Sequence, residues 1–182
     1  QFLDAHALAE FIDENHFTTI IIFASSFGGI AAVDTVAKYK ELYPDSTVNF
    51  VIAFMSSPAG PESLQPLSWL GAQFHAAIPV GAPTVWLETF LSTMSQGNKL
   101  PTDPTVMHDV SANAKATPPT LLHEQTARIL QGMAKLPDDG TIFTVYIGDN
   151  NDEVVKNQQA PSDIALRIGR AVDKIITMQY KD

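Results

Sequence analysis

The sequence predicts an α/β protein in which a mostly parallel β-sheet is flanked by helices. The run "TTIIIFA" (residues 18–24) is β-branched and apolar, which is typical of a parallel strand buried on both faces. A similar run, "TVNFVIAFM", covers residues 47–55, and an amphipathic segment of helical length separates the two. Strand, helix and strand with short connections form a βαβ unit, so these two strands should run parallel.

Further segments extend this core on both sides. Residues 2–16 have the apolar spacing of an amphipathic helix, and residues 27–44 form a second helix that Pro44 ends. The run "GTIFTVYIG" (140–148) returns to strand character. Residues 161–175 are mostly helical in pattern, and residues 174–180 suit a last strand.

The middle of the chain has a different character, because prolines interrupt it repeatedly. Between them lie three amphipathic pieces, which predict helices over residues 62–78, 83–97 and 118–136. We interpret this part as a helical cap inserted between two strands of the sheet. The predicted organisation is therefore a first core part (1–57), a cap insertion (58–139) and a second core part (140–182).

Composition excludes several classes of function. The net charge is −9 and no cluster of Lys and Arg is present, which argues against a nucleic-acid partner. The chain has no cysteine, so disulfides, zinc–thiolate sites and a cysteine nucleophile are excluded. No apolar run is long enough to span a membrane. We expect neither a metal nor another cofactor.

Two adjacent serines, Ser25 and Ser26, follow the first predicted strand. A nucleophile elbow is a sharp strand-to-helix turn, and the residues two before and two after its nucleophile must be small because the two arms nearly touch. For Ser26 these residues are Ala24 and Gly28, whereas for Ser25 both are phenylalanine. Ser26 is therefore the candidate nucleophile.

The helix after Ser26 would support this chemistry. Its N-terminus carries partial positive charge, and the backbone N–H of Phe27 would point at a developing oxyanion. Gly29 would let the helix pack close to neighbouring backbone. Two alternatives remain at this stage: Ser26 is only the N-cap of the helix, or Gly28 and Gly29 cradle a phosphate. No G-x-G-x-x-G or Walker pattern supports the second.

The chain resembles the α/β-hydrolase fold family in "TTIIIFASSFGGIAA" (18–32), "TVNFVIAFMSSPAG" (47–60) and "TIFTVYIGDNNDEVV" (141–155). Ala24 departs from the usual G-x-S-x-G motif at its first small position. The resemblance implies a partial α/β-hydrolase core, whose N-terminal strands and C-terminal histidine segment are not among these residues.

The same resemblance implies the position of the catalytic acid. In the family it follows the strand after the cap, in a loop similar to G-x-x-D-x-V-V. Here Asp152, followed by Val154 and Val155, matches the second half of that pattern and ranks first, and Asp149 ranks second. The alternatives are a loop chosen for turn chemistry alone, or a calcium loop, for which the ligand spacing of an EF-hand is absent.

No histidine occupies the family position after the acid. All five histidines precede Asp152: His6, His16, His75, His108 and His123. Three explanations compete: the chain is an interior piece of a longer hydrolase, His108 or His123 of the cap is the base, or the protein is a catalytically inactive relative. The first implies a complementary chain or segment that supplies the rest of the fold.

The predicted function is hydrolysis of a carboxylic ester or a related small acyl substrate by a Ser-His-Asp mechanism. The cap would form an apolar pocket for the acyl group. We expect Ser25, Trp69 and Trp86 to contact the substrate. The alternative is a catalytically inactive binding or assembly protein with the same fold.

Overall fold

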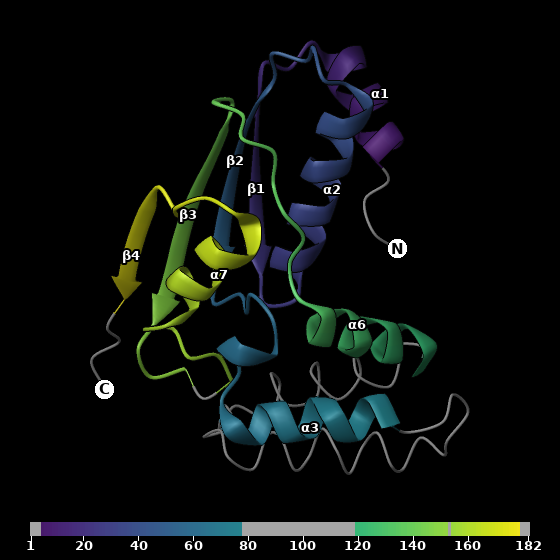
Figure 1. Cartoon of the computed structure of the whole chain (residues 1–182). Coiled ribbons are helices and arrows are strands. Elements are labelled where there is room, and N and C mark those ends of the chain that lie inside the picture. Colours follow the sequence, from purple (N-terminus) through teal and green to yellow (C-terminus); the bar gives the residue numbers. More distant parts are fainter. Residues whose placement is uncertain (1–4, 78–118, 153, 179–182) are drawn as a thin grey trace, which may run out of the picture.

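A computed structural model describes residues 5–77, 119–152 and 154–178 of the chain. Four strands form one sheet in the order β1-β2-β3-β4, and every neighbouring pair is parallel. The predicted α/β class and the predicted parallel sheet are therefore confirmed. Figure 1 shows the strands pointing the same way, so that their carboxyl ends share one edge.

The helices and strands follow the predicted order closely. The strands are β1 (Thr19–Ser25), β2 (Asn49–Met55), β3 (Ile142–Asp149) and β4 (Lys174–Met178). The helices are α1 (Ala5–Asn15), α2 (Gly28–Leu42), α3 (Pro66–Ala77), α6 (Pro119–Gln131) and α7 (Ala160–Ile168), with a single 3₁₀ turn, η1, at Pro61–Ser63. The helix predicted over residues 83–97 lies outside the described residues.

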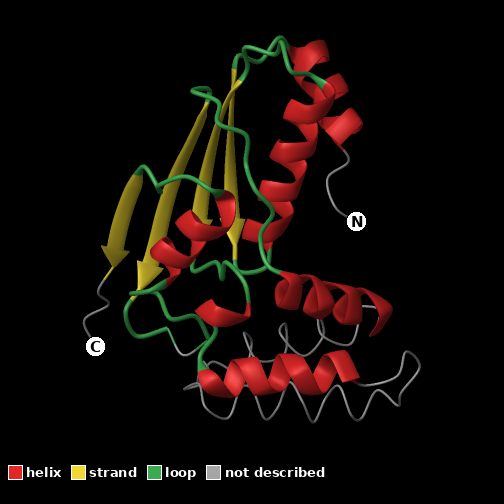
Figure 2. Ribbon diagram, in the orientation of Figure 1, coloured by secondary structure: helices red, strands yellow, loops and turns green. Residues whose placement is uncertain are grey.

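One face of the sheet forms the hydrophobic core. Phe50, Ile52 and Phe54 of β2 are completely buried, and the ring of Tyr39 on α2 packs 5.0 Å from the ring of Phe50. Helix α7 passes in front of the same sheet in Figure 2, and its Ile164 is also completely buried. This side of the sheet therefore has the helical cover that a parallel sheet requires.

The opposite face of the sheet differs from the prediction for β1. We expected this strand to be buried on both faces, but Ile21 is 57% exposed and Phe23 is 72% exposed. Their register partners lie on the same face, which continues through Met55 and Phe143, 37% and 44% exposed. No helix among the described residues covers this face, and the sequence could not reveal that because its apolar pattern is that of a covered strand.

The last helix is shorter than predicted. The pattern indicated a helix over residues 161–175, but α7 ends at Ile168. Gly169 adopts a left-handed conformation, with φ of 78°, and its N–H bonds to the carbonyl of Ala165. A glycine in this conformation is a common helix terminator, so the chain leaves the helix in time to enter β4.

Helices α3 and α6 lie beyond the carboxyl ends of the strands (Figure 1). Arg128 of α6 forms two short contacts with the carboxylate of Asp34 on α2, at 2.6 and 2.7 Å, which ties α6 to the core. The chain then returns along the core, where Met133 and Leu136 are buried. None of the described helices combines the length and apolar character needed to cross a bilayer.

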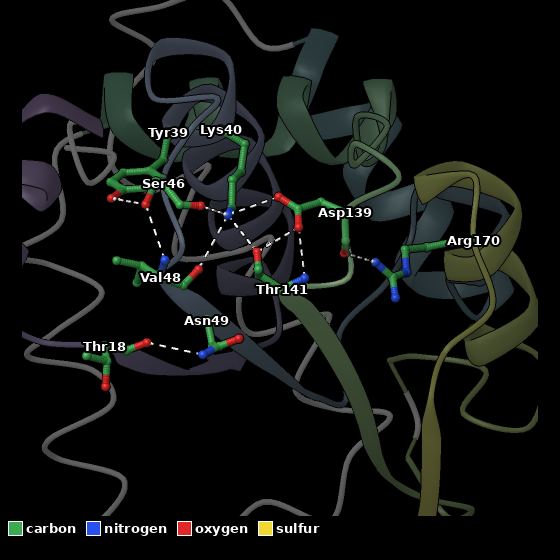
Figure 3. Close-up of polar contacts among 9 residues, drawn as sticks. All are labelled: Thr18, Tyr39, Lys40, Ser46, Val48, Asn49, Asp139, Thr141 and Arg170. Atoms are coloured by element: carbon green, nitrogen blue, oxygen red, sulfur yellow. Dashed lines mark hydrogen bonds and ion pairs between the residues drawn. The ribbon is translucent and has the colours of Figure 1, made fainter.

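A buried lysine holds the amino ends of β2 and β3 together. The side chain of Lys40 is only 3% exposed, and its amino group lies 2.9 Å from Asp139 and 2.6 Å from the hydroxyl of Thr141. The carbonyls of Ser46 and Val48 accept from the same amino group at 3.0 and 3.4 Å. Figure 3 shows this group surrounded by oxygen atoms from two segments of the chain, residues 46–48 and 139–141.

The acidic member of this network is Asp139. The backbone N–H of Thr141 bonds to its carboxylate at 2.8 Å, and this bond, with further help from Lys40 and the Thr141 hydroxyl, lowers the pKa of Asp139 to about 2. Asp139 is therefore ionised at every ordinary pH. The charged pair fixes α2 against the turn that begins β3.

Replacing Lys40 with methionine should lower the free energy of unfolding by about 3 kcal/mol. The substitution leaves the carboxylate of Asp139 and the hydroxyl of Thr141 without the charged group that they contact. Lys38→Met is the matched control: Lys38 is 52% exposed and its ion pair among the described residues is with Glu41, so its loss should stay below about 0.5 kcal/mol. Urea denaturation of both variants measures the difference. Equal losses would contradict the proposed importance of the buried pair.

The low pKa of Asp139 predicts a specific pH dependence. Its carboxylate stabilises the fold fully above its unfolded pKa of 3.8, and this contribution disappears as the pH falls toward the folded pKa of about 2. Asp139→Asn should therefore lose less stability than the wild type between pH 5 and pH 2. Parallel denaturation curves at several pH values test this, and identical slopes for the two proteins would contradict it.

Candidate active site

Ser26 forms the sharp turn between β1 and α2. Its φ is +49°, in the left-handed region that residues other than glycine rarely adopt. The N–H of Ser26 donates to the carbonyl of Met55 at 3.0 Å, and its own carbonyl accepts from Gly29 at 3.1 Å. The residue is exposed. Ser26 thus has the strained conformation and the accessible side chain that an elbow requires.

The first alternative for Ser26, a helix cap, is not observed. The N-cap position of α2 is Phe27, and no side chain caps the helix there. The hydroxyl of Ser26 makes no hydrogen bond to any described residue. A capping bond therefore does not explain the strained backbone. The hydroxyl lies at the carboxyl end of the sheet and has no structural role in the described part of the chain.

The close approach at the elbow occurs at Gly29 rather than at Gly28. A Cβ atom at Gly29 would lie 2.6 Å from Cβ of Ser57, whereas one at Gly28 would meet no described atom within 4 Å. Ser57 is completely buried, and its hydroxyl donates to the carbonyl of Ala24 at 2.7 Å. Gly29 therefore allows a close approach, as expected, but the neighbouring atoms belong to the side chain of Ser57 and not to backbone. The steric demand expected at Gly28 falls one residue later, because Ser57 fills the space beside the helix.

The two candidate acids lie at the end of β3 and in the loop after it. Asp149 is the last residue of the strand, and its carboxylate accepts from the N–H of Asn151 at 3.0 Å. One oxygen of Asp152 accepts from the N–H groups of Val154 and Val155 at 2.8 and 2.9 Å. Both carboxylates therefore shape the loop, as turn chemistry alone would require, and both are partly accessible.

A buried pair beneath this loop fixes its path. Tyr146 donates its hydroxyl hydrogen to the side-chain oxygen of Asn157, and the amide nitrogen of Asn157 donates to the carbonyl of Asp149 at 2.6 Å. Burial raises the pKa of Tyr146, and the negative charge of Asp152 raises it further, so the phenol stays protonated and keeps donating. Nothing in the sequence pattern predicted Asn157, which lies in a polar segment of ordinary loop composition.

The acid loop is also joined to the entry of α3. The N–H of Gln65 donates to the carbonyl of Val154 at 2.9 Å, and the N–H of Lys156 donates to the carbonyl of Ser63 at 2.8 Å. The side chain of Gln65 reaches the carbonyl of Asp152 at 3.3 Å. These bonds hold Asp152 beside the segment that leads into the predicted cap.

The parallel register brings these elements to one edge. Ser25 pairs with Met55 and Met55 pairs with Ile147, so the residues that follow them are neighbours across three strands. Ser26 therefore lies two strand positions from the start of the acid loop, about 10 Å at the spacing of neighbouring strands. That distance leaves room for one imidazole ring between a serine and a carboxylate.

Neither described histidine side chain can fill that gap. His6 bonds to the hydroxyl of Tyr43 at 3.2 Å, and Tyr43 caps the far end of α2, about 22 Å from its start. His16 precedes β1, whose opposite end carries Ser26. The side chains of His75 and His123, and the whole of His108, lie outside the described residues.

The predicted substrate-contacting residues are described only in part. Ser25 is exposed at the end of β1, next to Ser26. Trp69 lies on α3 and is 42% exposed. Trp86 lies outside the described residues. No three acidic or histidine side chains within the described ranges gather where they could hold a metal ion.

Comparison with known proteins identifies the fold of this chain. No protein-family model matches the sequence, and no curated protein matches it. Among solved structures, that of a protein described as an aryl esterase, from Burkholderia cenocepacia, superposes on this chain with a TM-score of 0.60 at 14% identity. A meta-cleavage product hydrolase from Pseudomonas fluorescens IP01 gives 0.53 at 16% identity, and a thermophilic esterase from Thermogutta terrifontis gives 0.50 at 16% identity.

These similarities show that the chain has a partial α/β-hydrolase fold. The match covers 96%, 95% and 96% of this chain but only 62%, 61% and 62% of the three compared chains. The chain therefore spans about three fifths of their length. The fold expected from the resemblance is confirmed, and the identities are too low to carry an activity across.

The two glycines of the elbow should respond differently to alanine. Gly29→Ala should lower the free energy of unfolding by about 1–3 kcal/mol, because the new methyl group overlaps Ser57. Gly28→Ala, the matched control at the neighbouring position, should change it by less than about 1 kcal/mol. Urea denaturation measures both. A loss at Gly28 as large as the loss at Gly29 would show that the close contact lies elsewhere.

Proposed function

We propose that this chain carries the nucleophile and the acid of a serine hydrolase that acts on a carboxylic ester or a related small acyl substrate. The observation that carries the proposal is Ser26 itself: a non-glycine residue in a left-handed conformation, exposed between a parallel strand and a helix. Strain of this kind costs about 1–3 kcal/mol and is typical of functional sites. The esterases and the hydrolase of similar fold support the same class of reaction.

In the proposed reaction Ser26 Oγ attacks the carbonyl carbon of the substrate, and a histidine accepts its proton. Asp152 orients this histidine, with Asp149 as the second candidate. The N–H of Phe27, at the start of α2, stabilises the oxyanion. Ser25, Trp69 and Trp86 contact the substrate under the cap.

The histidine comes from outside the described side chains. One source is the cap, where His108 and His123 are the candidates. The other is a complementary chain or segment, and two features of the structure favour it. β1 is an edge strand whose outer side is unpaired within the described sheet, and a cavity of about 560 Å³ lies along it, lined by Ile20, Ile22, Ala24 and part of α2.

The alternative function is a catalytically inactive binding or assembly protein. The observation in its favour is that neither described histidine lies near Ser26, which leaves the serine without a base in the described part of the chain. The two functions differ in one measurable property, the reactivity of the Ser26 hydroxyl.

A fluorophosphonate probe, which reacts with activated serines, should label the wild type at Ser26 and should not label Ser26→Ala. Asp152→Asn should slow labelling about 100-fold, because the acid orients the base, whereas Asp149→Asn should have a smaller effect. Ser162→Ala, which removes an exposed serine on α7, is the control and should react like the wild type. A folded wild type without labelling would favour the inactive alternative.

A further inference from the structure

Ser56 is a second serine with a strained backbone at the edge of the sheet. It follows β2 directly and has a φ of +45°. Among the described residues, His16 is the only other non-glycine residue besides Ser26 with a positive φ, and His16 ends α1, where left-handed residues are common. Ser56 follows a strand and ends no helix, so this explanation does not apply to it.

Ser56 stands beside Ser26 in the register of the sheet. The N–H of Ser26 donates to the carbonyl of Met55 at 3.0 Å, and the N–H of Ser56 donates in the same way to the carbonyl of Ile147 at 2.9 Å. Each serine is the first residue past its strand, and the paired strands place the two about 5 Å apart. Ser56 lies on the side of Ser26 that faces β3 and the acid loop.

The hydroxyl of Ser56 has no structural partner in the described part of the chain, although the residue is half-buried. Two serines that follow it in the sequence do have partners. The hydroxyl of Ser57 donates to the carbonyl of Ala24 at 2.7 Å, and that of Ser63 donates to Asp163 at 2.9 Å. The fold therefore uses the two buried hydroxyls and leaves that of Ser56 available. A strained residue with an unused hydrogen-bonding group is typical of a binding site.

We infer that Ser56 is a specificity-determining residue, whose hydroxyl binds a polar atom of the acyl substrate while Ser26 attacks it. This inference rests on the function proposed for Ser26. The backbones of the two serines are about 5 Å apart, so a Ser56 hydroxyl acting over a hydrogen bond of about 2.8 Å would reach a substrate atom two or three bonds from the carbonyl carbon. The substrate class is therefore an ester whose acyl group carries an oxygen or nitrogen atom at that distance.

Two esters of equal size test this inference. The acyl chain of p-nitrophenyl methoxyacetate has an ether oxygen two bonds from the carbonyl carbon, where p-nitrophenyl butyrate has a methylene group. The quantity to compare is the ratio of kcat/KM for the two esters, because differences in their intrinsic reactivity cancel when variants are compared. Ser56→Ala should lower this ratio about 3- to 10-fold, the usual effect of one neutral hydrogen bond.

Three further variants separate the hydroxyl from the backbone. Ser56→Gly removes the hydroxyl and accepts the left-handed conformation, so it should lower the ratio as Ser56→Ala does even if the alanine variant folds poorly. Ser56→Asn keeps a hydrogen-bonding side chain and tolerates the left-handed conformation, so it should retain part of the preference for methoxyacetate. Ser162→Ala, an exposed serine far along the sequence on α7, should leave the ratio unchanged.

The result separates the two proposals. If Ser26 reacts with the fluorophosphonate but the ratio is the same in wild type, Ser56→Ala and Ser56→Gly, the inference about Ser56 is wrong and the proposed function stands. If the folded wild type, tested together with the segment that supplies the histidine, shows no labelling at Ser26, the proposed function is wrong and the inference about Ser56 is wrong with it.

Discussion

The parallel register of β1, β2 and β3 determines where Ser26, Ser56 and the acid loop lie relative to one another. Because Ser25 pairs with Met55 and Met55 with Ile147, the residues that follow the strands meet at one edge. Ser26, Ser56 and Asp149 are far apart in the sequence, and no local interaction brings them together. A shift of one residue between β1 and β2 would turn the side chains of one strand to the other face and would separate the two serines.

The two edges of the sheet have opposite physical properties. At the amino edge, Lys40 and Asp139 form a charged pair with well-satisfied hydrogen bonds, which gives this end its rigidity. At the carboxyl edge, Ser26 and Ser56 have strained backbones and hydroxyls without partners in the described part of the chain. The stable edge can hold the strands in place while the other edge presents reactive or binding groups.

Much of the fold was predictable because it depends on local patterns. The apolar runs located β1, β2 and β3, and the small residues around Ser26 distinguished it from Ser25. The close contact between Gly29 and Ser57 was not predictable, because it joins segments that the sequence does not show to be neighbours. For the same reason the sequence indicated neither Asn157 beneath the acid loop nor the register that places Ser56 beside Ser26.

The apolar residues of β1 led to one correct prediction and one wrong prediction. Its apolar residues correctly indicated a parallel strand, but they also predicted cover on both faces, which the described structure provides on one face only. Apolar periodicity reports which surfaces are suited to burial and does not report what buries them. The same limit applies to the base of the proposed reaction, since neither the sequence nor the described side chains place a histidine at Ser26.

The outer side of β1, which is unpaired within the described sheet, has a consequence for handling the protein. A strand with free backbone groups and exposed side chains such as Ile21 and Phe23 is a template on which other extended chains can add. Self-association through this strand would grow with concentration and with salt, because salt screens the repulsion between molecules that each carry a net charge of −9. Dilute, low-salt solutions at neutral pH are therefore the conditions in which we expect least association between chains through β1.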